Sequence, residues 1–292
     1  MKRFAPIFAG VGYSTIFGFS YIASKNALEA LNPLELLFLR FSFATLVFVL
    51  LVAFRIIKLS YKGKPIGQLA LVCMFQPILY FVCETFGIKE CSTSTAGLML
   101  GAIPVTVAFL AWLVLDEKPT WLRMLSLLIS LSGVGFIALT VNHGENTFFG
   151  LLLLFGAIAS ASLYNVFSRK SSRIFTPMET TFAMMISGTL GFGLLALFNT
   201  SPDLVQRAIP KIPSIAYLGG LSSVVAFFLV NFNLSKLTAS QVSVFSNLST
   251  AVSVAAGVIF LGEHFGPLQA IGAVLILLGV WGANRNYYSQ ST

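Results

Sequence analysis

Long stretches without a charged residue constrain this chain more than any other feature of its sequence. Segments 91–115, 146–168, 180–202 and 237–261 contain no Asp, Glu, Lys or Arg. About 20 apolar residues are needed for a helix to cross the hydrocarbon core of a bilayer. Backbone polar groups in lipid must be paired within the structure, so such runs form helices. The strands of a barrel would instead alternate polar and apolar residues, which the four consecutive leucines 151–154 do not.

Composition also indicates an integral membrane protein. Only 10% of the residues are charged and 57% are hydrophobic, whereas soluble domains carry about 25% charged residues. The net charge of +8 does not indicate a nucleic-acid partner, because the basic residues lie between apolar runs rather than in one patch. We therefore expect an all-α membrane protein of ten transmembrane helices, at 4–24, 33–54, 65–83, 91–115, 124–142, 146–168, 180–202, 212–235, 237–261 and 265–284.

The distribution of Lys and Arg predicts the orientation of these ten spans. With the N-terminus inside, the cytoplasmic side receives thirteen basic residues and the outside four, and Arg40 lies within a span. Cytoplasmic loops carry the excess of Lys and Arg in membrane proteins. The sequence thus predicts a multi-pass protein of the inner (plasma) membrane with both termini in the cytoplasm. The outer four are Lys25, Lys89, Arg207 and Lys211.

The two halves of the chain resemble each other. An offset of 144 residues superposes Pro33 on Pro177, Glu35 on Glu179 and Thr45 on Thr189, and an offset of 146 superposes Glu117 on Glu263. Each half, 1–145 and 146–292, would contain five helices, so the second half would enter the membrane upside down. Inverted repeats with a site at their interface are typical of secondary transporters.

These features together resemble the drug/metabolite transporter superfamily, in particular its EamA-type ten-helix members. The resemblance covers nearly the whole chain and implies the export of a small solute, often an amino acid or related metabolite. Asp116 stands where such proteins usually have Gly before the glutamate of the first repeat, and Gly262 keeps that glycine in the second. The matching stretches are 18–25, the helix that contains Arg40, 95–117, 133–134, 261–263 and 279–280.

Arg40 and Glu84 are the ionisable residues expected inside the membrane: Arg40 lies in the second predicted span, and Glu84 lies near the outer end of the third helix at a similar depth. Arg40 lies seven residues from the outer end of its helix, a depth of about 10 Å at 1.5 Å per residue. An intramembrane charge costs about 2.5 kcal/mol or more, so it faces the bundle interior and usually has a partner. Two interpretations stay open: a structural ion pair between the two helices, or a site for the charged end of a substrate or for a coupling proton.

The remaining site candidates are polar or kinking residues of the spans. Gln76, Tyr80 and Glu84 recur every four residues and so share one helix face. Pro104 removes a backbone hydrogen bond and is expected to kink its helix. Amides and hydroxyls in such spans either bridge helices or contact solute. The predicted substrate-binding set is Ser20, Tyr21, Arg40, Gln76, Tyr80, Glu84, Pro104, Tyr164, Asn231 and Asn247, and its chemistry suits a small zwitterion or a flat, partly apolar metabolite.

Other motifs have structural interpretations. Glu117 and Glu263 stand before Pro119 and Pro267, and we expect each carboxylate to cap the helix that follows it. Cys73, Cys83 and Cys91 form no CxxC motif and are interpreted as buried apolar residues, and His143 and His264 fall in predicted loops.

We expect no catalytic residue, metal or cofactor; the expected partners are a small solute, the lipid bilayer and, as an open question, a coupling proton. The oligomeric state is left open, with a monomer compatible. The alternatives to a transporter are an intramembrane enzyme and a membrane scaffold or receptor.

Overall fold

The computed structural model describes residues 5–115, 121–139, 146–198, 200–263 and 265–288, and this part of the chain is helical apart from its connections. Eight of its helices are long and apolar enough to cross a membrane, and a shorter apolar helix covers Pro267–Gly279. The predicted all-α membrane class therefore agrees with the fold. The prediction of ten spans is not settled by these lengths, although α7 and α15 occupy the positions of the predicted fifth and tenth spans.

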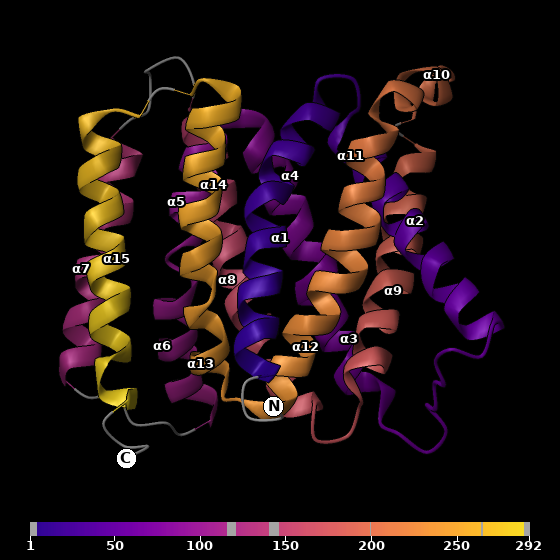
Figure 1. Cartoon of the computed structure of the whole chain (residues 1–292), viewed down its shortest axis with the longest axis horizontal. Helices are drawn as coiled ribbons and strands as arrows, with labels where there is room; N and C mark the ends of the chain where they lie inside the picture. The colour runs from indigo at the N-terminus through magenta and orange to yellow at the C-terminus, as the bar shows by residue number, and fades with distance from the viewer. Residues whose placement is uncertain (1–4, 116–120, 140–145, 199, 264, 289–292) are drawn as a thin grey trace.

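The helices of the two halves follow the same order (Figure 1). In the first half they are α1 (Ala5–Leu28), α2 (Pro33–Ala53), α3 (Ile66–Cys73), η1 (Met74–Leu79), α4 (Tyr80–Glu90), α5 (Thr93–Leu100), α6 (Ile103–Leu115) and α7 (Trp121–Ala138). In the second half they are α8 (Phe148–Ser171), α9 (Pro177–Leu197), α10 (Leu204–Ala208), η2 (Ile209–Lys211), α11 (Ile212–Ala216), η3 (Tyr217–Ala226), α12 (Phe227–Lys236), α13 (Ala239–Val244), α14 (Ser246–Leu261) and α15 (Pro267–Tyr288).

The third long helix of each half contains a widened, π-helical segment at an equivalent position. When η1 is shifted by 146 residues along the sequence, it falls within η3. In η1 the helix is interrupted at Gln76, whose backbone is extended (φ −147°, ψ 114°). The physical cause is Pro77, because the ring of a proline disfavours the helical conformation for the residue before it. Such π-helical irregularities often accompany functional sites.

The fourth long helix of the first half is also divided, as Pro104 predicts. α5 ends at Leu100 and α6 begins at Ile103, so Pro104 lies in the first turn of α6, where its missing N–H breaks no helical bond. Above this break α5 packs closely on α14 of the other half. A Cβ at Gly97 would overlap the Ser253 hydroxyl, and the Thr250 hydroxyl donates to the Gly97 carbonyl (3.1 Å).

The equivalent helices α2 and α9 pack directly against each other and run antiparallel. Phe41 contacts Phe192, and Phe48 contacts Phe182, with ring centroids 5.4 and 5.7 Å apart. Between these contacts the hydroxyls of Thr45 and Thr189, which the 144-residue offset makes equivalent, lie 2.8 Å apart. A contact between equivalent residues of antiparallel helices is what a two-fold axis across the helices produces, and this is the relation that an inverted repeat requires.

Two equivalent glutamates anchor connecting segments at the first turns of α2 and α9. Glu35 accepts a hydrogen bond from the Asn32 amide (2.8 Å) and pairs with Arg207 (2.7 Å). Glu179 accepts from the Thr176 amide (2.9 Å) and pairs with Lys64 (2.6 Å). Each carboxylate thus completes a capping box and also binds a segment that belongs to the other half.

The prediction that Glu263 caps the helix that follows it is wrong. Its carboxylate caps α5 of the first half rather than the following helix α15: the amides of Thr93 and Ser94 donate to its two oxygens at 2.6 and 2.7 Å. The prediction of a structural cap is therefore right in kind but wrong in the helix. The physical reason is that α5 presents two free first-turn N–H groups to this loop, an interaction that only the tertiary structure brings about. Glu117 lies outside the described residues.

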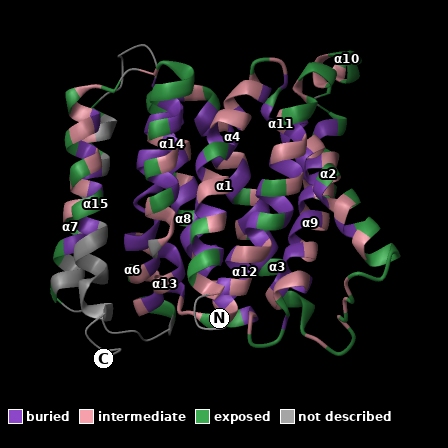
Figure 2. Cartoon of the chain, viewed as in Figure 1, coloured by how far each residue is buried: buried purple, intermediate pink, exposed green. Residues whose placement is uncertain are grey.

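Burial follows the arrangement expected in lipid. Buried residues run through the middle of the bundle, and exposed residues lie on its outer surface (Figure 2). Many of the exposed residues are large and apolar, including Phe8, Leu46, Leu190 and Phe260. The helices α7 and α15 pack together at one end of the molecule, and α2 and α9 lie towards the other end (Figure 1). The cavity described below lies between these two ends.

Candidate functional site

A cavity between the two halves brings most of the predicted site residues together. Its empty volume, open space at the mouth included, is about 750 Å³. Both halves contribute to its walls. It is lined by Tyr13, Phe17, Ser20, Tyr21, Arg40, Gln76, Tyr80, Phe81, Glu84, Leu100, Ile103, Ala161, Tyr164, Asn165, Phe227, Val230, Val242, Ser243, Ser246, Ser249 and Thr250.

Arg40 of α2 is held in the cavity wall by neutral groups. Its Nε donates to the Ser223 hydroxyl and its Nη2 to the Ser222 hydroxyl, both at 2.8 Å. Its guanidinium carbon lies 4.2 Å from the centre of the Phe81 ring. The residue is 2% exposed. Hydroxyls and a ring face orient the guanidinium without cancelling its charge.

Glu84 of α4 lies in the same cavity and is 5% exposed. The Tyr80 hydroxyl, one turn earlier, donates to its Oε1 (3.2 Å), as the four-residue spacing predicts. Its Oε2 is buried and has no hydrogen-bond partner. Gln76 also lines the cavity, but it does so from the interruption in η1 rather than from a continuous helix face.

The structural ion pair between Arg40 and Glu84 is not formed. Among the described residues, no N–O distance within 4.0 Å pairs either group with an opposite charge. One cavity therefore holds a buried guanidinium and a buried carboxyl group that both lack a direct counter-ion. Because isolated intramembrane charges are costly, such residues mark functional sites by default.

Aromatic rings from both halves form the apolar part of the cavity wall. Phe227 of α12 is the centre of this group, with its ring centroid 5.2 Å from Phe17, 5.8 Å from Phe81 and 6.3 Å from Tyr164. Tyr13 lies 6.0 Å from Phe17 and donates through its hydroxyl to the Val242 carbonyl (2.8 Å). The rings are thereby fixed against one another and present apolar faces to the space beside Arg40 and Glu84.

Three predicted site residues do not line the cavity. Pro104 is buried in the first turn of α6. Asn231 joins three helices: it accepts from Tyr164 (2.9 Å) and Ser168 (2.8 Å) of α8, and donates to Thr181 of α9 (3.0 Å). Asn247 has a buried amide oxygen without a hydrogen-bond partner. Of these, Asn231 has the bridging contacts that the sequence left open as its alternative.

The sequence analysis missed several residues of the site. Phe17 and Phe227 are ordinary apolar residues of their spans, and no pattern separates them from lipid-facing phenylalanines. Ser222 and Ser223, which hold Arg40, left a weak signal: they are a polar pair after two glycines in an apolar run. The 146-residue offset also makes Ser222 equivalent to Gln76, which faces the same cavity.

Within the described part of the chain, no three His, Cys, Asp or Glu side chains lie close enough together to hold a metal ion. The cavity itself offers hydroxyls, aromatic rings, a guanidinium and a carboxyl group. These groups suit the binding of a small, partly apolar molecule that carries both a negative and a positive charge.

In comparison with known proteins, each half of the chain matches the same family. The EamA-like transporter family matches residues 4–139 and again 148–285. The "Uncharacterized transporter YcxC" of Bacillus subtilis (strain 168) is 33% identical over 287 residues, which cover 95% of this chain and 92% of that protein. The "Probable terminal-alkyne amino-acid exporter" of Streptantibioticus cattleyicolor is 25% identical over 77% of this chain and 75% of its own.

A solved crystal structure shares the fold. It superposes with a TM-score of 0.69 over 97% of this chain and 98% of that chain, at 18% sequence identity. At this level of identity the superposition concerns the fold alone.

Proposed function

Because this chain belongs to the EamA-like transporter family, we propose that it is a secondary active transporter that exports a small zwitterionic metabolite by alternating access. An amino acid or a related compound with an aromatic body fits the cavity best. The proposed division between the two halves is at residue 145, and the separate family matches to residues 4–139 and 148–285 support it. The proposed location is the inner membrane, with both termini in the cytoplasm.

One observation carries the choice of a zwitterion: a basic group, Arg40, and an acidic group, Glu84, lie buried in one cavity without a direct counter-ion. A carboxylate of the substrate would accept from the guanidinium, and an ammonium would donate to Glu84 Oε2. Binding would then supply to both groups the partner that the free protein lacks. Buried charges are stabilised only when they are paired and hydrogen-bonded.

The rest of the cavity selects against other charge patterns. A phosphate binds best to several Arg or Lys side chains, and the cavity offers Arg40 alone, opposed by Glu84. The rings of Phe17 and Phe227 would contact the apolar body of the substrate. Tyr21, Ser20 and Gln76 add hydroxyl and amide groups that fix its orientation. A relative named as an amino-acid exporter supports the same class of substrate.

The symmetry of the bundle supports alternating access. Equivalent helices of the two halves pack antiparallel at Thr45 and Thr189, and residues of both halves line the cavity. In an inverted repeat, the exchange of the two halves' conformations converts an inward-open state into an outward-open one. The cavity would then face each side of the membrane in turn.

A flux measurement tests the proposal. The protein reconstituted in vesicles loaded with unlabelled L-amino acids should take up a labelled amino acid by exchange. Flux separates a transporter from an intramembrane enzyme and from a scaffold, neither of which would move solute. Uptake of a phosphorylated solute with no response to amino acids or aromatic amines would overturn the choice of substrate.

Arg40→Met tests the recognition step. A charge-assisted hydrogen bond is worth about 1.5–3 kcal/mol, so loss of the guanidinium should weaken amino-acid competition by about tenfold or more. Competition by an amine without a carboxylate should change much less. Arg55→Met, at an exposed site outside the cavity, is the matched control and should behave as the unmodified protein.

A further inference from the structure

The segment that follows α2, residues 54–65, is strongly basic. It contains no Asp or Glu, and its basic residues are Arg55, Lys58, Lys62 and Lys64. Lys64 pairs with Glu179 (2.6 Å). For the other three, no acidic side chain of the described residues lies within 4.0 Å. Three cationic side chains of one short segment therefore have no counter-ion in the part of the chain that the structure describes.

The inverted repeat contains a matching segment whose cations are paired. The 144-residue offset makes Phe54, the C-cap residue of α2, equivalent to Phe198, the C-cap residue of α9, and both side chains are exposed. The segment after α9, residues 198–211, contains two basic residues, and both form ion pairs. These are Arg207 with Glu35 (2.7 Å) and Lys211 with Glu29 (2.6 Å). Equivalent places in the fold thus differ in whether the protein neutralises its own basic residues.

Exposed apolar side chains flank the first of the unpaired cations. Phe54 is 73% exposed and Ile56 is 67% exposed, on either side of Arg55 in the sequence. The next residue, Ile57, packs instead against the core of the bundle. Exposed apolar side chains at the end of a membrane-spanning helix contact lipid, and long basic side chains beside them reach the headgroups. The segment therefore places positive charge next to a lipid-facing apolar surface.

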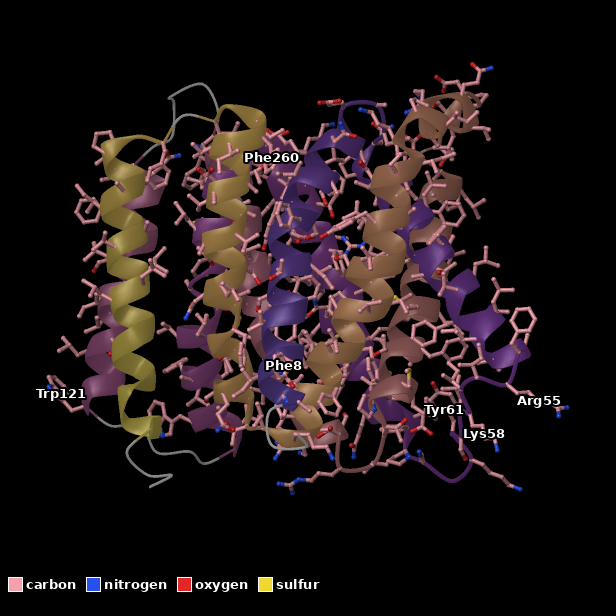
Figure 3. The ribbon with its side chains drawn as sticks, in the orientation of Figure 1. Phe8, Arg55, Lys58, Tyr61, Trp121 and Phe260 are labelled. Carbon is pink, nitrogen blue, oxygen red and sulfur yellow. The ribbon has the colours of Figure 1, made fainter. Side chains whose placement is uncertain are left out.

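The protein fixes this segment at both ends. The Ile56 amide donates to the Leu51 carbonyl (2.9 Å), which turns the chain directly after α2. Further along, the Ser60 amide donates to Glu179 Oε1 (3.0 Å) and the Tyr61 hydroxyl to the Glu179 carbonyl (2.8 Å). Between these two attachments, Arg55 and Lys58 point away from the bundle (Figure 3). The cations are thus held on the outside of the molecule.

We propose that residues 54–62 form a binding site for an anionic phospholipid. Arg55, Lys58 and Lys62 bind its phosphate, and Phe54 and Ile56 contact its acyl chains. A guanidinium binds phosphate oxygens in a bidentate manner, and ammonium groups add positive charge. A zwitterionic lipid has the same phosphate, but its own cationic headgroup repels the three basic residues, so the site prefers an anionic lipid. In the proposed orientation the site faces the cytoplasmic leaflet, whose surface is negative.

Fluorescence quenching in vesicles measures which lipid lies beside the segment, because brominated acyl chains quench only nearby indoles. Phe54→Trp and Phe198→Trp place a reporter at equivalent, exposed positions, and the signal of the native tryptophans is subtracted with the unmodified protein. Each Lys or Arg near an anionic lipid contributes about fivefold in affinity. In Phe54→Trp, phosphatidylglycerol should therefore be preferred over phosphatidylcholine by about fivefold or more. In Phe198→Trp, the two lipids should quench alike.

Charge variants assign the preference to the three unpaired cations. In Phe54→Trp, the combined substitutions Arg55→Gln, Lys58→Gln and Lys62→Gln should remove the preference for phosphatidylglycerol. The matched control removes three exposed charges elsewhere and should keep the preference; its substitutions are Lys170→Gln, Arg173→Gln and Lys236→Gln. Inorganic phosphate, compared with chloride at equal ionic strength, separates a lipid site from a site for free phosphate. The two salts should weaken the preference equally, by screening alone.

Several results would overturn the lipid site. They are equal quenching by both lipids in Phe54→Trp, the same preference in Phe198→Trp, and a preference that survives loss of the three cations. A preference lost equally in the matched control would show that general surface charge is responsible. Displacement by inorganic phosphate but not by chloride would instead identify a site for a free anion. None of these results bears on the central cavity, so the proposed transport function is tested separately by flux.

Discussion

At the scale of single residues, the interior of this bundle contains two kinds of polar side chain. Asn231 has its amide oxygen and nitrogen satisfied by Tyr164, Ser168 and Thr181. Glu84 Oε2 is left unpaired. Satisfied networks hold helices in place, and unsatisfied buried groups need a ligand, a proton or another explanation. The number of partners therefore separates bridging groups from candidate ligand groups.

The network of Asn231 yields a stability prediction. Asn231→Leu leaves the hydroxyls of Tyr164 and Ser168 without their acceptor and should cost about 1 kcal/mol, seen as a lower thermal midpoint in detergent. Asn247→Leu is the matched control, because it removes an amide oxygen that has no partner, and it should be neutral or stabilising. Equal destabilisation by both substitutions would show that the hydrogen bonds of Asn231 contribute nothing specific.

At the scale of elements, the first turns of α2 and α9 are equivalent anchoring points. Glu35, fully buried, binds the segment that follows α9, and Glu179, 3% exposed, binds the segment that follows α2. The first turn of each helix thus binds the connecting segment that follows the equivalent helix of the other half. The carboxylates also lie near the positive ends of the helix dipoles, which adds to the stabilisation.

Glu179→Gln tests this anchoring. The substitution removes the charge that binds Lys64 and the Ser60 amide and should cost about 1–2 kcal/mol, discounted because Lys64 is partly exposed. Hydrogen exchange should accelerate in residues 58–65 and not in the segment bound by Glu35. Asp203→Asn, at an exposed pair with Arg207, should leave the thermal midpoint close to that of the unmodified protein. Uniform acceleration along the chain would contradict local anchoring.

At the scale of the whole molecule, the polar edges of the bundle indicate its orientation. Arg55 and Lys58 point away from the bundle at the edge where α1 begins, which is also the edge where α15 ends (Figure 3). The short helix α10 lies at the opposite edge (Figure 1). Because cytoplasmic loops carry the excess of Lys and Arg in membrane proteins, we propose that the first edge is the cytoplasmic one.

Cysteine labelling checks this orientation. In a variant whose native Cys73, Cys83 and Cys91 are replaced by Ala, Lys58→Cys and Asp203→Cys place single exposed thiols at opposite edges. A membrane-impermeant maleimide should label Asp203→Cys in intact cells and Lys58→Cys only after permeabilisation. Labelling of both, or of Lys58→Cys alone, in intact cells would contradict cytoplasmic termini.

The sequence by itself determined the class of the fold, the positions of most helices and the pairing of the two halves. Uncharged runs such as 146–168 can be satisfied in lipid only as helices, so local composition was sufficient. Equivalent residues such as Thr45 and Thr189 could be matched by offset alone, and the structure adds that they touch. The intramembrane charges Arg40 and Glu84 were visible because their cost in lipid is large wherever they lie.

Only the tertiary structure decided which partners these residues have. Phe17 and Phe227 could not be recognised in the sequence as cavity residues, because phenylalanine occurs both on lipid-facing surfaces and in cavity walls. Arg40 and Glu84 lie in one cavity without pairing, since Ser222 and Ser223 orient the guanidinium. Contacts across the repeat interface join residues far apart in the chain. The distance between two helices cannot be derived from helical periodicity or composition, because it depends on the packing of the whole bundle.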